Sequence, residues 1–436
     1  MESTAFDQLT RQFAGRRLTR RGAMMSSGAL TASALALHGQ RGTLAQGATP
    51  AATPAVDPAM QAAEIVALAQ EAMVDKALKS VILRVTIDGE ELVTQALGES
   101  MTGVPATPDM HFRNGAVAIS YVSMLLLQLV DEGKVTLDDP LANWFTEFPN
   151  ADRVTLKMLA NMTSGYPDYV PDQDFFDAFN ANPFRQYTTD ELLAFAFKSP
   201  VHFEPGVNWS YAHTNVVILG RVIEKVTGTP MATLMQEKLF APLGLNNTAS
   251  FATPEIPEPA LHAFSSERRT SLGVPAGNRF YEESSFWNPS WTLAEGTIQT
   301  TNIYDMTATA EAIGAGKLLS PESHEAMTAP NLLGFGAPLE GCLTCHTLDE
   351  AYSYGLGLVI SGEWLLQNPL FGGYGAIEAY LPSDKIAIAV STTFAEASFG
   401  DDGGYLHSRA SWEIFAEIAN YLVPDKAPVS TRETSA

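Results

Sequence analysis

Two cysteines and a histidine stand close together, in the order Cys342, two further residues, Cys345 and His346. This spacing is that of a c-type haem attachment site, where the thiols bond to the haem and the histidine ligates the iron. The alternative is a short disulfide, which is typical of exported chains. We expect the disulfide, with no haem and no metal, because the motif lies in a loop and the sequence supplies no further zinc ligands.

A second group that could do chemistry is Tyr211-Ala212-His213. A histidine donates and accepts hydrogen bonds and titrates near neutral pH, so His213 could move protons. The simpler interpretation, a loop histidine bonded to the backbone, is favoured unless a nucleophile lies nearby. A serine three residues before a lysine on a helix would be such a nucleophile, since one turn places the amine beside the hydroxyl. No lysine of this chain has a serine at that position.

Eight segments between residues 112 and 360 carry a family resemblance. They are FRNGAVAIS (112–120), DEGKVTLDDPLANWFTEFP (131–149), VTLKMLANMTSGYPDY (154–169), FEPGVNWSYAHTNVVILGRVIEKVTGTP (203–230), APLGLNNT (241–248), AEGTIQTTNIYDM (294–306), GKLLSPES (316–323) and YGLGLVI (354–360). Together they resemble the superfamily of serine β-lactamases, penicillin-binding proteins, D-Ala-D-Ala carboxypeptidases and related esterases. The chain looks like a degenerate member of it.

The resemblance implies a nucleophilic serine at position 116 and a neutral lysine base at position 119, but the chain has Ala116 and Ile119. A methyl group cannot attack a carbonyl, and an alkyl side chain cannot accept a proton. Joint loss of the pair is physically coherent, because a buried lysine without its partner is costly. Ser120 is a poor substitute, since it should point about 100° away around the helix. We therefore expect a catalytically inactive homologue; the alternative is a weak or rerouted hydrolase that uses Tyr211, His213 or Ser120.

The resemblance also assigns ligand contacts. Tyr211 matches the family tyrosine that helps to move protons, while His213 replaces the usual amide. The third motif, on an edge strand that binds the substrate carboxylate and carries part of the oxyanion hole, matches Gly373-Tyr374-Gly375, where no cation is present and Tyr374 is expected to fill part of the cleft. Two more cleft candidates are Glu295, at a turn where a small residue is usual, and Trp287, in an aromatic stretch that either holds a ligand or packs in the core.

Composition and net charge limit the kinds of partner that this chain can bind. The 436 residues are 46% hydrophobic, enough for one large core with two subdomains rather than several domains. The net charge of −23 argues against nucleic acid and anionic membranes, which such a chain repels. A small molecule or peptide remains the expected ligand.

The N-terminal residues predict export. Arginine pairs precede an apolar run from about residue 23 to 37 and a small-residue exit, a pattern typical of a twin-arginine signal over 1–47. The run is too short to span a membrane comfortably, so cleavage is favoured over a retained anchor. A Pro/Ala linker at 48–59, a β-lactamase-related domain at 60–424 and a tail at 425–436 follow. The mature chain is expected outside the cytoplasm, with no stable membrane span.

The predicted elements define an α+β fold. Asp88-Gly89 between two alternating apolar segments predicts a β-hairpin after a first helix at 60–79. An apolar helix ends near Gly133, Thr188 with Glu191 matches a capping box, and strands at 354–360 and 385–394 precede a last helix at 407–422. This order predicts an antiparallel sheet flanked by helices, with an inserted helical subdomain.

Overall fold

The structure, a computed structural model, describes residues 57–251, 253–275, 277–329 and 332–429. The predicted signal at 1–47, the linker except 57–59, and the end of the tail from residue 430 lie outside the described residues. Helix α2 (Pro58–Asp75) begins two residues before the predicted boundary at 60, because the Asp57 carboxylate accepts a hydrogen bond from the Ala59 amide and caps it. None of the described helices has the length and apolarity needed to cross a membrane.

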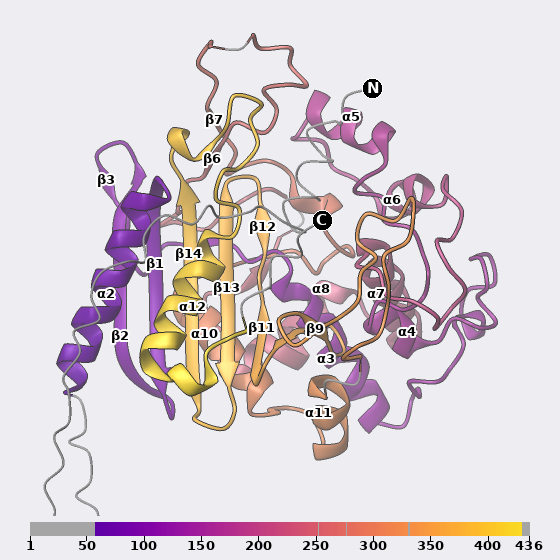
Figure 1. Cartoon of the computed structure of the whole chain (residues 1–436). Coiled ribbons are helices and arrows are strands. Elements are labelled where there is room, and N and C mark those ends of the chain that lie inside the picture. The colour runs from indigo at the N-terminus through magenta and orange to yellow at the C-terminus, as the bar shows by residue number, and fades with distance from the viewer. Residues whose placement is uncertain (1–56, 252, 276, 330–331, 430–436) are drawn as a thin grey trace, which may run out of the picture.

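The centre of the fold is an antiparallel sheet whose strands come from both ends of the chain (Figure 1). Its order is β3-β2-β1-β14-β13-β11-β10-β9, and β12 also pairs with β13. The strands are β1 (Leu78–Ile87), β2 (Glu90–Met101), β3 (Val104–Pro105), β9 (Ser353–Tyr354), β10 (Val359–Ser361), β11 (Trp364–Gln367), β12 (Leu370–Phe371), β13 (Tyr374–Leu381) and β14 (Ile386–Phe394). The hairpin predicted at Asp88-Gly89 joins β1 to β2.

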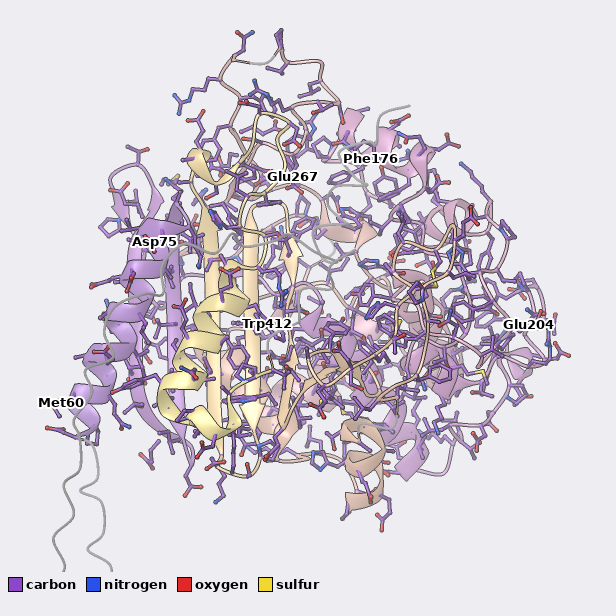
Figure 2. The ribbon with its side chains drawn as sticks, in the orientation of Figure 1. Met60, Asp75, Phe176, Glu204, Glu267 and Trp412 are labelled. Carbon is purple, nitrogen blue, oxygen red and sulfur yellow. A yellow bond between two sulfur atoms is a disulfide. The ribbon has the colours of Figure 1, made fainter. Side chains whose placement is uncertain are left out.

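Helices cover both faces of this sheet. α2 packs on β1 and β2, and α12 (Ala410–Leu422) packs on β13 and β14, while α10 (Ile303–Gly314) packs on the same strands from the opposite side. The alternation along β14 explains this arrangement: Ile388 and Val390 belong to the larger core cluster, whereas Ala387 and Ala389 belong to the clusters shared with α10. In Figure 2, side chains fill the space between these layers, and Met60 and Asp75 mark the ends of α2.

The inserted helical region lies beside the sheet (Figure 1). It contains α3 (Val117–Asp131), α4 (Leu156–Ala160), α5 (Gln173–Ala181), α6 (Thr189–Ala196), α7 (His213–Thr227), α8 (Met231–Met235), α9 (Ala241–Leu243) and α11 (Pro321–Thr328), with short turns η1 (Leu141–Asn143), η2 (Gln236–Phe240) and η3 (Pro289–Trp291). Two further turns, η4 (Glu396–Ser398) and η5 (Pro424–Lys426), flank α12. The start of the predicted tail packs on the fold through η5, because the Trp364 indole donates a hydrogen bond to the Lys426 carbonyl.

Small strand pairs connect the insertion to the sheet: β4 (Phe112–Arg113) and β5 (Ala249–Ser250) pair with β8 (Gln299–Thr301), and β6 (Phe264–Ser265) pairs with β7 (Glu282–Glu283). The capping box at the start of α6 is present, since Thr188 and Glu191 each bond to the other's backbone. α3 is buried along nearly its whole length and ends before Gly133, whose φ is +69°. The predicted α+β class is confirmed.

Candidate functional site

The start of α3 carries the first motif. Ala116 is the N-cap residue with helical dihedrals and makes no side-chain capping bond. Gly115 before it has a φ of +47°, and a Cβ there would lie only 2.6 Å from the Cβ of Pro369. The segment just before β12 therefore lies directly against the helix start where the resemblance implies a nucleophile.

The next turn of α3 faces the interior. Ile119 is 1% exposed and belongs to the large core cluster. Ser120 is fully buried, and its hydroxyl donates to the Gly357 carbonyl at 2.9 Å. An alcohol engaged in the core in this way is not available to attack a ligand, so Ser120 is a structural residue.

The second motif is held by a carboxylate that the sequence analysis did not single out. His213, the first residue of α7, places its Nδ1 2.9 Å from Oδ2 of Asp168, and the Asp168 Oδ1 accepts the His213 backbone amide at 3.3 Å. The bond to the backbone expected for His213 is therefore a bond to a side chain. Asp168 was visible in the segment 154–169, but only the fold brings it beside a residue 45 positions away.

Tyr211 lies next to this pair. Its ring is perpendicular to the His213 imidazole, with centroids 5.2 Å apart. Burial, with contributions from Tyr352 and Asp168, raises the pKa of the Tyr211 hydroxyl. At neutral pH Tyr211 is thus a hydrogen-bond donor and not a base.

The loop that contains the disulfide contacts the segment that carries the second motif. Cys342 and Cys345 form a disulfide, and both are nearly buried. Thr344 between them hydrogen-bonds to the Ser210 hydroxyl at 2.8 Å and donates to the Tyr211 carbonyl at 3.1 Å. The His346 imidazole packs edge-on against the Trp209 ring, 4.9 Å away. The loop therefore fixes the backbone that carries the second motif.

The third motif differs from its expected role. Gly373 has a φ of +87°, and a Cβ on it would collide with the backbone oxygen of Phe264, so this position cannot carry the family cation without a backbone shift. Tyr374 is 2% exposed and donates to the Leu261 carbonyl at 2.5 Å. Its ring is a core residue of the smaller cluster, and the expectation that it fills part of the cleft stays a prediction. At Gly375 a Cβ would lie 2.8 Å from the Thr392 hydroxyl.

Backbone pairing occupies the start of β13. β12 pairs with it, Leu370 opposite Gly375 and Phe371 opposite Tyr374. The next amide, of Ala376, donates to the Pro369 carbonyl at 2.9 Å. The strand edge that the resemblance assigns to the ligand is thus bonded to the chain itself.

The other two cleft candidates are Trp287 and Glu295, and Trp287 lies beside the third motif, since a Cβ on Gly372 would lie 3.1 Å from its ring. Trp287 is 1% exposed and packs edge-on against Phe179, in the smaller core cluster that also contains Tyr374. Its contact with a ligand stays a prediction. Glu295 is exposed in the turn before Gly296. The aromatic residue that does reach the second motif is Trp291, whose ring lies 6.2 Å from His213 and 5.7 Å from Phe371. Trp291 stands in the stretch that the sequence analysis marked as rich in aromatics.

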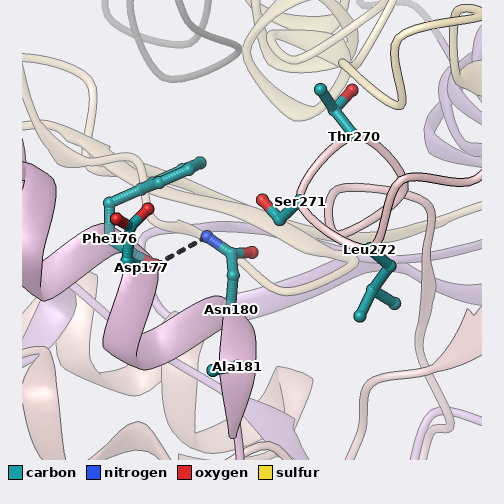
Figure 3. Close-up of a pocket in the computed structure, with 7 residues that line it drawn as sticks. All are labelled: Phe176, Asp177, Asn180, Ala181, Thr270, Ser271 and Leu272. Atoms are coloured by element: carbon teal, nitrogen blue, oxygen red, sulfur yellow. Dashed lines mark hydrogen bonds between the residues drawn. The ribbon is translucent and has the colours of Figure 1, made fainter.

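One buried acid lies near α3. Glu378 on β13 is 1% exposed, and burial raises its pKa well above the ordinary value. It lines an interior cavity of about 10 Å³ together with Ser120. A second cavity, of about 350 Å³, opens at the surface between α5 and the turn at 270–272, where Phe176, Asp177 and Leu272 line it (Figure 3). Within the described parts of the chain, no group of three or more His, Cys, Asp or Glu residues could hold a metal ion.

An antiparallel sheet covered by helices on both faces, with a long buried helix and an inserted helical region beside the sheet, is the architecture of the β-lactamase-type serine hydrolases. The family Beta-lactamase matches residues 65–410, and the chain belongs to this family. Over 303 residues it is 27% identical to the esterase EstB of Burkholderia gladioli, covering 64% of this chain and 77% of the esterase. Over 296 residues it is 26% identical to the putative penicillin-binding protein PbpX of Bacillus subtilis, covering 67% and 65% of the two chains.

Solved structures agree on the fold. The D-amino acid amidase of Ochrobactrum anthropi SV3, in complex with D-phenylalanine, superposes with a TM-score of 0.67 at 21% identity, covering 82% of this chain and 99% of the amidase. A D-stereospecific amidohydrolase from Streptomyces gives 0.63 at 23% identity, covering 79% and 98%. At these identities the likeness is one of fold.

Proposed function

We propose that this chain is an exported, non-acylating member of the β-lactamase family that binds a small molecule or a peptide. The observation that carries the proposal is the start of α3, where Ala116 offers no nucleophile and Ile119, 1% exposed, offers no base. Removal of one member of a catalytic triad in another serine hydrolase costs turnover by about a millionfold, so loss of both groups leaves little room for the acyl-enzyme route.

The third motif supports the same conclusion independently. An oxyanion hole needs backbone donors free to receive developing negative charge. Here the Ala376 amide already donates to the Pro369 carbonyl, and Gly373 has no side chain to bind a carboxylate. Acylation would thus lack its nucleophile, its base and part of its electrostatic stabilisation.

Export is part of the proposal. The arginine pairs and apolar run at 1–47 support it, and so does the Cys342–Cys345 disulfide, which persists in oxidising compartments. Replacement of Arg16, Arg17, Arg20 and Arg21 by lysine should retain the chain in the cytoplasm if the twin-arginine route is used, as cell fractionation would show.

A rerouted hydrolase is the second candidate, and the Asp168–His213 pair favours it. A carboxylate-oriented imidazole is the arrangement of a general base that activates water. Hydrolysis of p-nitrophenyl acetate that disappears in His213→Asn and persists in Ala116→Gly would identify this route.

The test of the main proposal is intact-mass spectrometry of the purified wild-type protein after incubation with a penicillin and, separately, with a fluorophosphonate. We expect the unmodified mass in both. A stoichiometric adduct, located by peptide mapping, would refute the proposal and identify the nucleophile.

A further inference from the structure

The Asp168–His213 pair presents an unused hydrogen-bond acceptor. A carboxylate only accepts hydrogen bonds, so the contact of 2.9 Å between Oδ2 of Asp168 and Nδ1 of His213 places the proton of a neutral imidazole on Nδ1. Nε2 is then an acceptor, and within the described residues no hydrogen bond to it is found. The His213 side chain is 19% exposed, so Nε2 can receive a donor from outside the protein.

Aromatic rings surround this imidazole. The centroid distances from His213 are 5.2 Å to Tyr211, 5.9 Å to Tyr169 and 6.2 Å to Trp291. Tyr169 is fully buried and donates to the Trp291 carbonyl at 2.6 Å, so it fixes the position of the tryptophan. Tyr211 and Trp291 remain partly exposed. Their ring faces carry partial negative charge and attract cations.

The Asp168–His213 pair carries negative charge. The Asp168 side chain is 10% exposed, and its only ion-pair partner in the described part of the chain is His213. While the imidazole is neutral, the pair carries one net negative charge, within a chain whose net charge is −23. An anionic ligand would be repelled here, and a neutral hydroxyl or amide would gain only the hydrogen bond.

We propose that Asp168, His213, Tyr211 and Trp291 form a recognition site for a primary ammonium group on an apolar or aromatic ligand. The ammonium donates to Nε2 of His213, lies within the field of Asp168 and contacts the faces of Tyr211 and Trp291, while its apolar body packs on the same rings. The inference rests on the proposed function, because such a ligand is bound and not acylated.

The experiment is isothermal titration of the full-length mature protein with three probes that share a phenyl ring. They are 2-phenylethylamine, 2-phenylethanol and 3-phenylpropanoate, a cation, a neutral donor and an anion. We expect the amine to bind at least about tenfold more tightly than the other two, the size of one cation–π contact. His213→Leu and Asp168→Asn should each remove this preference.

A matched control exists in the same chain. His262 also places Nδ1 against a carboxylate, that of Glu283 at 2.5 Å, beside the ring of Phe286, 5.9 Å away. His262→Leu should therefore leave the amine preference unchanged. Chemical-shift changes on the Trp291 indole would locate the bound amine, whereas changes confined to Phe176 and Leu272 would place it in the surface cavity and overturn the proposal.

Different results would refute the ammonium site and the non-acylating function. Equal binding of the three probes, or an amine preference that survives His213→Leu, would overturn the ammonium site and leave the absence of acylation standing. An adduct with the fluorophosphonate would overturn the non-acylating function and leave the amine preference to be judged by its own titration.

Discussion

A lysine at position 119 should strongly destabilise this protein rather than restore a base. Ile119 is 1% exposed within the large core cluster, so the new amine would have to be neutral in the folded state. An ordinary lysine has a pKa of about 10.4, which is roughly 3.4 above a solution pH of 7. Each pH unit of this difference costs about 1.4 kcal/mol, so releasing the proton at pH 7 costs about 4 to 5 kcal/mol. This is a large share of the roughly 5 to 15 kcal/mol that stabilises a typical domain.

The effect of pH identifies the cause. A lysine whose folded pKa is lowered makes the unfolded state bind more protons, so the free energy of unfolding should rise with pH. For Ile119→Lys we expect a gain of about 1.4 kcal/mol per unit between pH 7 and 9 relative to wild type. Urea unfolding followed by tryptophan fluorescence at pH 7, 8 and 9 measures both quantities. Ile119→Met, of similar volume and without charge, should cost less than about 1.5 kcal/mol and show no added slope.

One result would refute the reasoning. If Ile119→Lys were as stable as Ile119→Met and showed the same pH dependence, the lysine would be charged and paired, and a pocket for the family amine would still exist. The double variant Ala116→Ser, Ile119→Lys should then acylate with a penicillin. We expect instead that it does not, because Gly373 and the Ala376 amide cannot supply the third motif.

Three further changes test other parts of the structure. Burial raises the Glu378 pKa, so the folded state holds the proton longer and wild-type stability should fall as pH rises from the unfolded pKa through the folded one. Glu378→Gln should reduce this fall, as urea unfolding over a pH series would measure. Gly373→His should cost about 1 to 3 kcal/mol of stability and so lower the thermal midpoint, because the φ of Gly373 is +87°; a midpoint equal to that of the wild type would contradict this. Joint Cys342→Ser and Cys345→Ser substitution should cost about 2 kcal/mol, the chain-entropy effect of so short a loop, and an unchanged urea midpoint would count against it.

Local patterns predicted much of the fold. Asp88-Gly89 specifies its own turn, and Thr188 with Glu191 caps its own helix, because the interacting groups lie within a few residues. The apolar stretch that ends near Gly133 likewise indicated a buried helix. Such features depend on chain neighbours, and the sequence contains them directly.

The site was harder to predict because it depends on distant pairs. Asp168 reaches His213, 45 positions away, only after the insertion folds. Pro369 and Ala376 are close in the sequence, but no side-chain pattern indicates the backbone bond between them. The burial of the Tyr374 ring could not be predicted either, because its hydrogen-bond partner, the Leu261 carbonyl, is far away in the sequence.

The pairing of β12 with the start of β13 also affects how copies of this protein meet. An open strand edge offers unpaired amides and carbonyls to any other chain, and is a common starting point for aggregation. A strand that must receive a substrate keeps such an edge open. Here Leu370 and Phe371 cover Gly375 and Tyr374, and Pro369 engages the Ala376 amide. This pairing leaves fewer free backbone groups for intermolecular strand addition at this position.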